Sequence, residues 1–159
     1  MRRRGRGRFT PLFDPSPGEP RNIPVFVYGS LLSGLGNHRV LTQHWPHKLG
    51  PGRTLKAEFR MVGLGGFPAV SEGGVESVVG EVYMVTKEGF ADLDSLEGYP
   101  GFYDRMRVQV VLGDGRTMVD PWMYVLRGRE ARRTTGPHVP RGDWRAWTEA
   151  NWTRDGWRR

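Results

Sequence analysis

One carboxylate of this chain, Glu97, lies where a predicted helix turns its apolar side inward. Residues 87–96 (KEGFADLDSL) place Phe90, Leu93 and Leu96 at helical spacing. At about 100° per residue, Glu97 falls roughly 40° from the centre of that apolar stripe. Burial and the negative end of the helix dipole both disfavour the charged form of a carboxyl group. We therefore expect the pKa of Glu97 to rise toward the range useful for proton transfer.

Sequence signals at both ends set the limits of this helix. Thr86 precedes it as a candidate N-cap, and Gly98 follows it as a stop signal. Three other acids lie about 100° or more from the apolar stripe, namely Glu88, Asp92 and Asp94. We therefore expect Glu97 alone among these acids to point inward. One alternative stays open, in which Glu97 occupies a frayed helix end and leans back into water.

A loop of glycine and other small residues follows the first apolar run of the chain. Residues 23–28 (IPVFVY) have the pattern of a buried strand, and Tyr28, Gly29, Ser30 and Leu31 lie at its end. Glycine permits unusual backbone angles, and small residues let a ligand approach main-chain N–H groups. Such a loop can hold a carboxylate or an oxyanion, and it can equally be an ordinary turn.

Several other catalytic arrangements are missing from the sequence. Ser30 has neither a nucleophile-elbow pattern around it nor an evident histidine base. The chain has no cysteine, which excludes disulfides and thiolate nucleophiles. Pro46 separates His44 from His47 and disfavours the helix that a metal-binding pair would use. There is no phosphate-loop or dinucleotide fingerprint, so we expect neither a metal nor a cofactor.

The positive charge of the chain belongs to its two ends. The net charge is +7, to which residues 1–21 contribute +4, residues 22–126 contribute −2 and residues 127–159 contribute +5. Residues 1–21 are rich in Arg, Gly and Pro, which predicts a disordered basic tail, with an incorrectly assigned upstream start as the alternative. A solvated tail explains this composition without nucleic acid, so we do not expect nucleic acid as a partner.

The length of 159 residues suits one domain, which we place at residues 22–151, followed by a basic C-terminal tail at 152–159. No run approaches the roughly 18 apolar residues of a membrane span. The N-terminus has charges without the apolar segment of a secretory signal. We therefore expect a cytoplasmic protein that does not associate with a membrane.

Short strands and a central helix dominate the predicted order of elements. The 23 glycines and 12 prolines favour many turns over a helical bundle. Strands are predicted at 23–28, 55–62 and 78–85 and in a hairpin of 103–112 with 117–126, short helices at 37–44 and 143–151, a glycine-rich excursion at 63–74, and a basic loop after residue 127. This order predicts an α+β fold: a small mixed, mainly antiparallel β-barrel or sheet with a few flanking helices.

Two well-separated segments resemble one enzyme family. Residues 25–41 (VFVYGSLLSGLGNHRVL) and 79–105 (VGEVYMVTKEGFADLDSLEGYPGFYDR) are similar to the gamma-glutamylcyclotransferase-like superfamily, and to its gamma-glutamylamine cyclotransferase branch in particular. The later sequences WMY at 122–124 and GDW at 142–144 are similar to further signatures of that family. The resemblance covers about residues 24–147 and leaves both tails outside.

The resemblance implies a reaction and a site. Glu97 aligns with the catalytic glutamate of the family, which accepts and donates the proton, and the loop of Tyr28, Gly29, Ser30 and Leu31 would bind the gamma-glutamyl moiety. Tyr103 matches the tyrosine of the family's P-x-x-Y-x-R segment, and we expect it to contact the substrate as well. The reaction would convert a gamma-glutamyl amine or gamma-glutamyl amino acid to 5-oxoproline and the free amine, without a cofactor.

Two alternatives to this reaction stay open. The chain could be a non-catalytic binding module of the same fold that uses its basic tails on nucleic acid or an acidic partner. It could also catalyse hydrolysis or acyl transfer to another acceptor. For the cyclotransferase, we expect residues 63–74 and the C-terminal segment to form the leaving-group side of the pocket.

Overall fold

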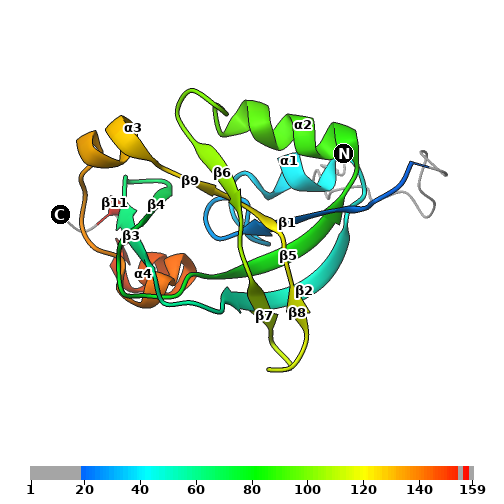
Figure 1. Cartoon of the computed structure of the whole chain (residues 1–159). Helices are drawn as coiled ribbons and strands as arrows, with labels where there is room; N and C mark the ends of the chain where they lie inside the picture. The colour runs from blue at the N-terminus through cyan, green and yellow to red at the C-terminus, as the bar shows by residue number, and fades with distance from the viewer. Residues whose placement is uncertain (1–18, 154–155, 158–159) are drawn as a thin grey trace, which may run out of the picture.

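A curved, seven-stranded sheet organises the computed structural model, which describes residues 19–153 and 156–157 (Figure 1). The strand order is β6-β9-β1-β5-β2-β7-β8. The interior strand β1 (Ile23–Val27) pairs antiparallel with β5 (Val79–Val85) and parallel with β9 (Trp122–Val125). The other neighbouring pairs in this sheet are antiparallel. The predicted α+β class with a mixed, mainly antiparallel sheet is therefore confirmed.

Helices cover the sheet where its strands are most apolar. The side chains of Val25, Phe26 and Val27 on β1 are all buried, as a continuous apolar run requires when both faces of a strand are covered. Helix α1 (His38–Thr42) and helix α2 (Lys87–Leu96) lie together on one side of β1 (Figure 1). Both helices were predicted, and α2 has the predicted bounds.

Two predicted regions of the sheet differ from the structure. Strand β2 (His47–Thr54) was missed because it carries two glycines, a proline and mostly exposed side chains, so it has no apolar alternation. Backbone pairing to β5 and to β7 (Val110–Leu112) holds it instead. The strand predicted at 55–62 begins only at Phe59, as β3 (Phe59–Gly63). Part of the predicted glycine-rich excursion is strand β4 (Pro68–Glu72), which forms a hairpin with β3.

The predicted hairpin of 103–126 is present but interrupted. Its base is the pair β6 (Asp104–Arg107) and β9, and its tip is the pair β7 and β8 (Met118–Val119). Two short helices follow, α3 (Gly128–Arg133) within the predicted basic loop and the 3-10 helix Pro140–Gly142. The predicted last helix is α4 (Trp144–Asn151), with the Asp143 carboxylate accepting from the Ala146 backbone N–H at 3.0 Å.

The ends of the chain lie partly outside the described residues. The predicted N-terminal tail covers residues 1–21, of which 1–18 are not described. Within the predicted C-terminal tail, β10 (Trp152–Thr153) pairs with β11 (Gly156–Trp157). In the described part of the chain, no helix combines the length and the apolar character needed to cross a membrane.

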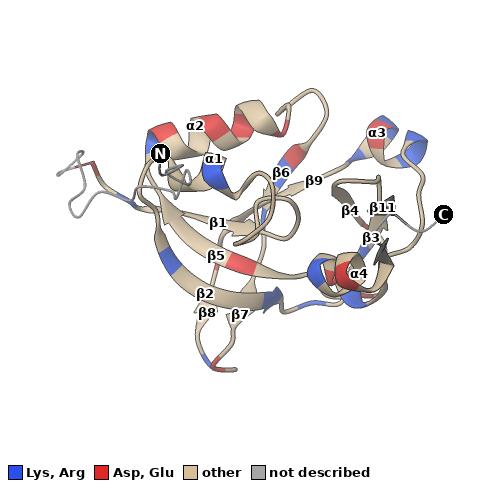
Figure 2. Ribbon diagram, turned by 180° about the vertical axis from the view of Figure 1, so that it is seen from behind, with Lys and Arg blue, Asp and Glu red and all other residues tan. Residues whose placement is uncertain are grey.

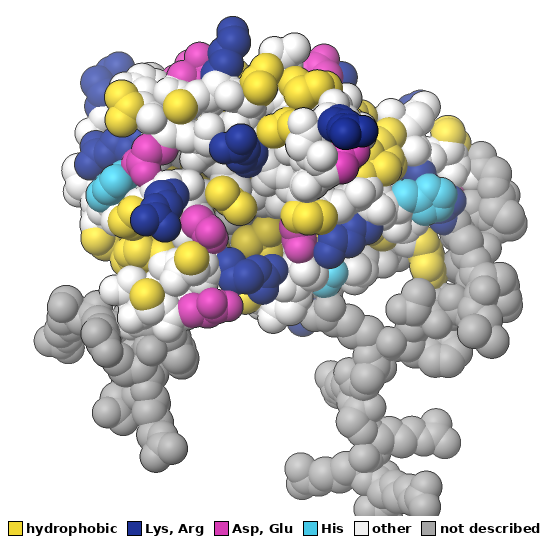
Figure 3. Space-filling model, turned by 90° about the horizontal axis from the view of Figure 1, so that it is seen from below, with side chains coloured by type: hydrophobic (Ala, Val, Ile, Leu, Met, Phe, Trp, Pro, Cys, Tyr) yellow, Lys and Arg dark blue, Asp and Glu magenta, His cyan; other side chains and the backbone are white. Residues whose placement is uncertain are grey.

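Charged side chains of both signs are spread over the domain. Acidic positions recur along α2, whereas α4 carries both signs (Figure 2). On the face seen from below, basic and acidic side chains are interspersed with apolar ones (Figure 3). This mixed pattern agrees with the small negative charge that the sequence assigns to residues 22–126.

Candidate active site

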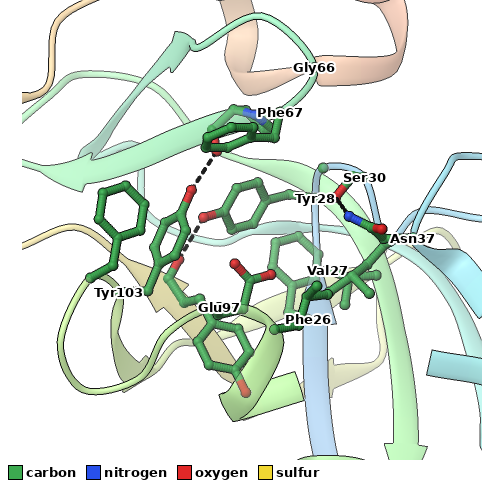
Figure 4. Close-up of a pocket in the computed structure, with 15 residues that line it drawn as sticks. Phe26, Val27, Tyr28, Ser30, Asn37, Gly66, Phe67, Glu97 and Tyr103 are labelled. Atoms are coloured by element: carbon green, nitrogen blue, oxygen red, sulfur yellow. Dashed lines mark hydrogen bonds between the residues drawn. The ribbon is translucent and has the colours of Figure 1, made fainter. Parts of the chain in front are cut away.

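Helix α2 fixes the position of Glu97 through a cap at each end. The Thr86 hydroxyl accepts from the Gly89 backbone N–H at 3.1 Å, which is the predicted N-cap. Glu97 is the C-cap, and its own N–H donates to the Leu93 carbonyl at 2.9 Å. Gly98 follows with a φ of +64°, a left-handed conformation that ends helices and suits glycine. From this last turn, the Glu97 side chain projects into a cavity (Figure 4).

Two details of the predicted helix are corrected. Phe90 and Leu93 are buried, but Leu96 is 40% exposed and lines the cavity instead of the core. Asp94 does not simply face water, because it accepts a hydrogen bond from the Tyr124 hydroxyl at 2.7 Å and forms an ion pair with Arg105. Both partners lie on neighbouring strands, so the angular pattern of the helix alone does not reveal them.

The cavity brings together all of the predicted site residues. It has a volume of about 320 Å³. The predicted residues that line it are Tyr28, Gly29, Ser30, Leu31, Glu97 and Tyr103. They come from the end of β1, the loop after it, the end of α2 and the segment before β6, which the sheet places around one space (Figure 4). Residues nearly 70 positions apart in the sequence therefore share one pocket, as Tyr28 and Glu97 show.

The Glu97 carboxylate is partly buried and accepts no hydrogen bond from the described residues. Burial without a compensating donor disfavours its charged form and raises the pKa of Glu97 to about 7. The cause is desolvation. A carboxyl group with this pKa is divided between acid and base near neutral pH, which is the condition for accepting and donating a proton in one reaction cycle.

Two tyrosines beside Glu97 direct their hydroxyl groups to backbone carbonyls. The Tyr28 hydroxyl donates to the Tyr124 carbonyl at 2.7 Å, and the Tyr103 hydroxyl donates to the Pro68 carbonyl at 2.7 Å (Figure 4). Burial, and then the charge of Glu97, raise the pKa of Tyr103, so this hydroxyl stays protonated. Because both protons are already donated, neither tyrosine supplies a hydrogen bond to the carboxylate.

Glycine is needed at position 29 for space and not for an unusual backbone angle, contrary to the prediction. Gly29 does not have a positive φ, whereas a Cβ atom at this position would lie 2.6 Å from the Pro68 Cδ atom. The loop therefore packs directly on β4. Ser30 Oγ accepts from Asn37 Nδ2 at 2.9 Å, which ties the loop to the residue before α1. In the described structure, the N–H groups of Gly29, Ser30 and Leu31 donate to no acceptor.

Glu81 on β5 holds the loop that borders the cavity, and sequence reasoning did not single it out. Its carboxylate accepts from the Ser33 backbone N–H at 2.8 Å and from the Ser33 hydroxyl at 2.7 Å. Lys48 Nζ lies 3.3 Å from the same carboxylate, and the Tyr83 hydroxyl donates to it at 3.2 Å. Glu81 thus anchors the loop that follows β1. The available signal was an acid inside the apolar strand sequence VGEVYMV, since a buried carboxylate requires partners.

Aromatic side chains complete the cavity wall. Those that sequence reasoning did not assign to the site are Phe26, Phe67, Phe102 and Tyr124. Tyr124 lies in the sequence WMY at 122–124, which resembles a signature of the family, but it was not predicted to line the site. Phe67 and Pro68 come from the predicted glycine-rich excursion, so that segment does border the site. An apolar wall explains why water solvates Glu97 poorly.

The described residues offer no site for a metal ion built from three or more His, Asp or Glu side chains. The cavity itself contains a carboxyl group of raised pKa and, in the loop after β1, backbone N–H groups that have no acceptor in the described structure. A carboxyl group of raised pKa and free N–H donors are the kinds of group that general acid–base catalysis and oxyanion binding use.

The comparisons with known proteins identify the family. A family model described as gamma-glutamyl cyclotransferase, AIG2-like, matches residues 25–146, and the chain belongs to this family. A candidate gamma-glutamylcyclotransferase from Vibrio cholerae is 36% identical over 120 residues, which cover 76% of this chain and 93% of the relative. Gamma-glutamylaminecyclotransferase from Bos taurus is 34% identical over 121 residues, covering 70% of this chain and 68% of its own.

A solved structure agrees with this assignment. The crystal structure of an AIG2-like protein from Mus musculus superposes with a TM-score of 0.61 at 25% sequence identity. The match covers 76% of this chain and 97% of the mouse protein. The fold expected from the sequence resemblance is thus also the fold of a structurally characterised relative.

Proposed function

We propose that the protein is a cyclotransferase that converts a gamma-glutamyl amine or gamma-glutamyl amino acid to 5-oxoproline and the free amine. The observation that carries this proposal is the state of Glu97, a carboxyl group in a cavity, without a hydrogen-bond partner among the described residues and with a pKa of about 7. The family membership and the name of the bovine relative support it.

The substrate contains its own nucleophile. In a gamma-glutamyl amide, the alpha-amino group can reach the gamma-carbonyl carbon and close a five-membered ring. Ionised Glu97 takes a proton from the alpha-ammonium group, and the freed amine attacks the carbonyl. Protonated Glu97 then gives its proton to the departing nitrogen as the amide C–N bond breaks, and the second proton of the ring nitrogen passes to the same amine, which leaves as an ammonium ion. No water is consumed, and the carboxylate returns to its starting state.

The loop after β1 holds the gamma-glutamyl moiety in this proposal. Ring closure places a negative charge on the carbonyl oxygen, and backbone N–H groups stabilise such an oxyanion when they are fixed in advance. The N–H groups of Gly29, Ser30 and Leu31 are the candidates, because they line the cavity and have no acceptor in the described structure. Tyr28 and Tyr103 contribute apolar ring surface, since their hydroxyl protons are already donated.

The alternative of a non-catalytic binding module has no support from the comparisons, which point to a family of enzymes. The arginine-rich segment on which it rested lies mostly at residues 1–18, outside the described structure. On the face that Figure 3 shows, basic and acidic side chains are interspersed, so that face gives no separate argument for it.

The test is the substitution Glu97→Gln, which removes proton transfer while keeping nearly the same shape. With a panel of gamma-glutamyl amines and gamma-glutamyl amino acids, we expect the wild-type protein to release 5-oxoproline from at least one compound. For that compound, Glu97→Gln should lower kcat/KM by about 10²- to 10⁴-fold, the usual contribution of general acid–base catalysis. Glu88→Gln, on the exposed side of the same helix, is the matched control and should change kcat/KM less than twofold, roughly the effect of a surface substitution.

Two outcomes would contradict the proposal. Retention of activity by Glu97→Gln, with an unchanged unfolding midpoint, would remove Glu97 from its proton-transfer role. Loss of substrate without formation of 5-oxoproline would replace ring closure by hydrolysis or transfer to another acceptor.

A further inference from the structure

The last turn of α2, which carries Glu97, is held on the sheet by side chains of two neighbouring strands. Arg105 of β6 lies opposite Tyr124 of β9 in the antiparallel register, so the two side chains project from the same face of the sheet. On that face they meet Asp94, which lies about one turn before Glu97 in α2. The Asp94 carboxylate accepts from the Arg105 guanidinium and, at 2.7 Å, from the Tyr124 hydroxyl.

Aromatic rings surround the same guanidinium group. Its central carbon lies 4.1 Å from the centre of the Tyr99 ring, 4.3 Å from that of Phe90 and 5.1 Å from that of Trp122. These rings belong to the segment after α2, to α2 itself and to β9. A guanidinium ion over aromatic rings is attracted by their π electrons, more strongly where water is excluded. The side chains of Arg105 and Asp94 are only 19% and 23% exposed, so this attraction and their ion pair are both partly shielded from water.

Backbone hydrogen bonds connect this cluster to Glu97. The Asp94 carbonyl accepts from the Tyr99 N–H at 2.9 Å, and the Glu97 carbonyl accepts from the Tyr103 N–H at 3.3 Å, which is long for such a bond. The chain passes from the end of α2 through this segment directly into β6 (Figure 1). Helix ends fray readily, and a frayed last turn is the alternative that the sequence left open for Glu97. The contacts of Arg105 oppose such fraying.

We propose that Arg105 is a positioning residue that keeps the last turn of α2 on the sheet and thereby keeps the Glu97 side chain inside the cavity. This inference rests on the proposed cyclotransferase function and adds to it a residue that does not line the cavity. Arg105 acts through Asp94 and the helix, whereas the loop after β1 has its own anchor at Glu81. Loss of Arg105 should therefore slow proton transfer and change substrate binding little.

A pair of substitutions separates position from charge. Arg105→Met alone would leave the Asp94 carboxylate unpaired, which destabilises the fold and also raises the pKa of Glu97 by repulsion. Arg105→Met/Asp94→Asn removes one charge of each sign, and the new amide oxygen can still accept from the Tyr124 hydroxyl. We expect kcat to fall by about 10²-fold, the loss that a displacement of about 1 Å can cause, and KM to change by less than about twofold.

The matched control is Arg107→Met/Asp120→Asn, which makes the same two changes at an exposed pair of the same strand. Arg107 lies two residues further along β6, pairs with Asp120 at 3.4 Å, and has its guanidinium carbon 5.3 Å from the centre of the Trp122 ring. The two side chains are 45% and 63% exposed, and neither lines the cavity of Glu97. Because an exposed ion pair contributes little, kcat and KM should both stay within about twofold of the wild type.

Carbon-13 NMR of the glutamate carboxyl groups reports on Glu97 without turnover, and comparison with Glu97→Gln assigns its signal. Among the described residues, the titratable groups that face this carboxyl group in the cavity are the hydroxyls of Tyr28, Tyr103 and Tyr124. Burial raises the pKa of each, so all three stay protonated near neutral pH. Glu97 should titrate near 7 in the wild type and closer to 4.5 in the Arg105 double variant, because a released helix end exposes the carboxyl group to water.

The outcomes keep the two proposals apart. In the folded double variant, a kcat equal to that of the wild type, or an unchanged titration midpoint of Glu97, would reduce Arg105 to a stabilising residue and overturn the inference. If the double variant does not fold, Arg105→Lys decides instead, because it keeps the charge and loses the planar group between the rings. The same changes in kcat and midpoint are then expected, to a smaller extent. Absence of 5-oxoproline from the wild type overturns the cyclotransferase function, and the titration of Glu97 still tests Arg105.

Discussion

Two glutamates on either side of the loop after β1 show opposite ways to keep a carboxylate away from water. Glu81 on β5 is 9% exposed and accepts hydrogen bonds from Ser33, Lys48 and Tyr83. Glu97 at the end of α2 is partly buried and accepts none from the described residues. Both are the same residue type, so the difference lies in what surrounds them.

The two surroundings move the two pKa values in opposite directions. Burial alone would raise the pKa of Glu81, but the hydrogen bonds from Ser33 and the charge of Lys48 outweigh it and hold the pKa below its ordinary value. For Glu97, burial acts without opposition. Glu81 is therefore locked in its ionised form, where it holds the loop, whereas Glu97 keeps a proton that it can exchange. A buried carboxylate that accepts hydrogen bonds stays ionised and stabilises the structure. A buried carboxyl group that accepts none has a raised pKa and can exchange a proton near neutral pH.

The largest expected effect is on the pH dependence of stability, in which the wild type should differ from Glu97→Gln. The pKa of Glu97 is about 7 in the folded state and near 4.5 in the unfolded state, so the folded protein holds this proton more tightly. Its contribution to stability is full below pH 4.5 and is lost as the pH rises to 7. Relative to Glu97→Gln, the free energy of unfolding of the wild type should fall by about 3 kcal/mol over this window.

Urea unfolding of both proteins at several pH values between 4 and 8 measures this difference. If the wild-type and Glu97→Gln curves run parallel across the window, then Glu97 titrates normally and the contrast with Glu81 disappears. A difference in the free energy of unfolding between the two proteins that is the same at every pH would reflect a change in packing and not a shifted pKa.

The contribution of Glu81 to the free energy of unfolding should depend on pH in the opposite sense, and the effect should be smaller. Its lowered pKa means that its stabilisation is present above the unfolded value near 4.5 and is lost as the pH falls through the folded value. Glu81→Gln replaces charge-assisted hydrogen bonds by neutral ones and should lower the free energy of unfolding at pH 7 by about 2 kcal/mol. Because Glu81 anchors the loop whose N–H groups we propose for the oxyanion, and does not itself line the cavity, we expect kcat/KM to fall by less than in Glu97→Gln.

Chemical unfolding at pH 7 and steady-state kinetics on the same samples check both parts. An unchanged unfolding midpoint would show that the hydrogen bonds to Ser33 contribute nothing to stability. A loss of kcat as large as that of Glu97→Gln, with KM unchanged, would place Glu81 in the chemistry and break the distinction between the two residues.

The contrast also marks what the sequence could predict. Glu97 was singled out from local information, because helix periodicity and two cap signals indicate which way its side chain points, whereas its catalytic role came from the resemblance to the family. The loop of Tyr28 to Leu31 was found because it directly follows a continuous apolar strand. The partners of Glu81 could not be found in this way, since Ser33 and Lys48 are 48 and 33 residues away in the chain. Their contact depends on the strand order and on the course of the loop after β1.

Strand β2 was not predicted for the same reason. Its residues carry almost no pattern, and the strand exists because β5 and β7 offer backbone partners on both sides. Lys48, one of the partners of Glu81, lies on it. The contacts of Glu81 thus depend on β2, the strand that local patterns predict least well. The position of Glu97 depends on α2, the element that local patterns predict best.

The smallest expected effect concerns the second attachment of the loop, between Ser30 and Asn37. The Ser30 hydroxyl accepts from Asn37 Nδ2 at 2.9 Å, and both groups are neutral and partly buried. Ser30→Ala should therefore lower the free energy of unfolding by about 1 kcal/mol.

Ser33→Ala is the matched comparison, because it removes one hydroxyl from the same loop. That hydroxyl donates to the charged Glu81 at 2.7 Å, and a hydrogen bond to a charged group contributes about 1.5–3 kcal/mol. Thermal unfolding of both variants at pH 7 should rank Ser33→Ala as the less stable. The reverse ranking would mean that the neutral contact at Ser30 holds the loop and that the charge of Glu81 does not. With the expected ranking, the loop is held from the side of Glu81, and the end that faces Glu97 keeps its N–H groups available to a ligand.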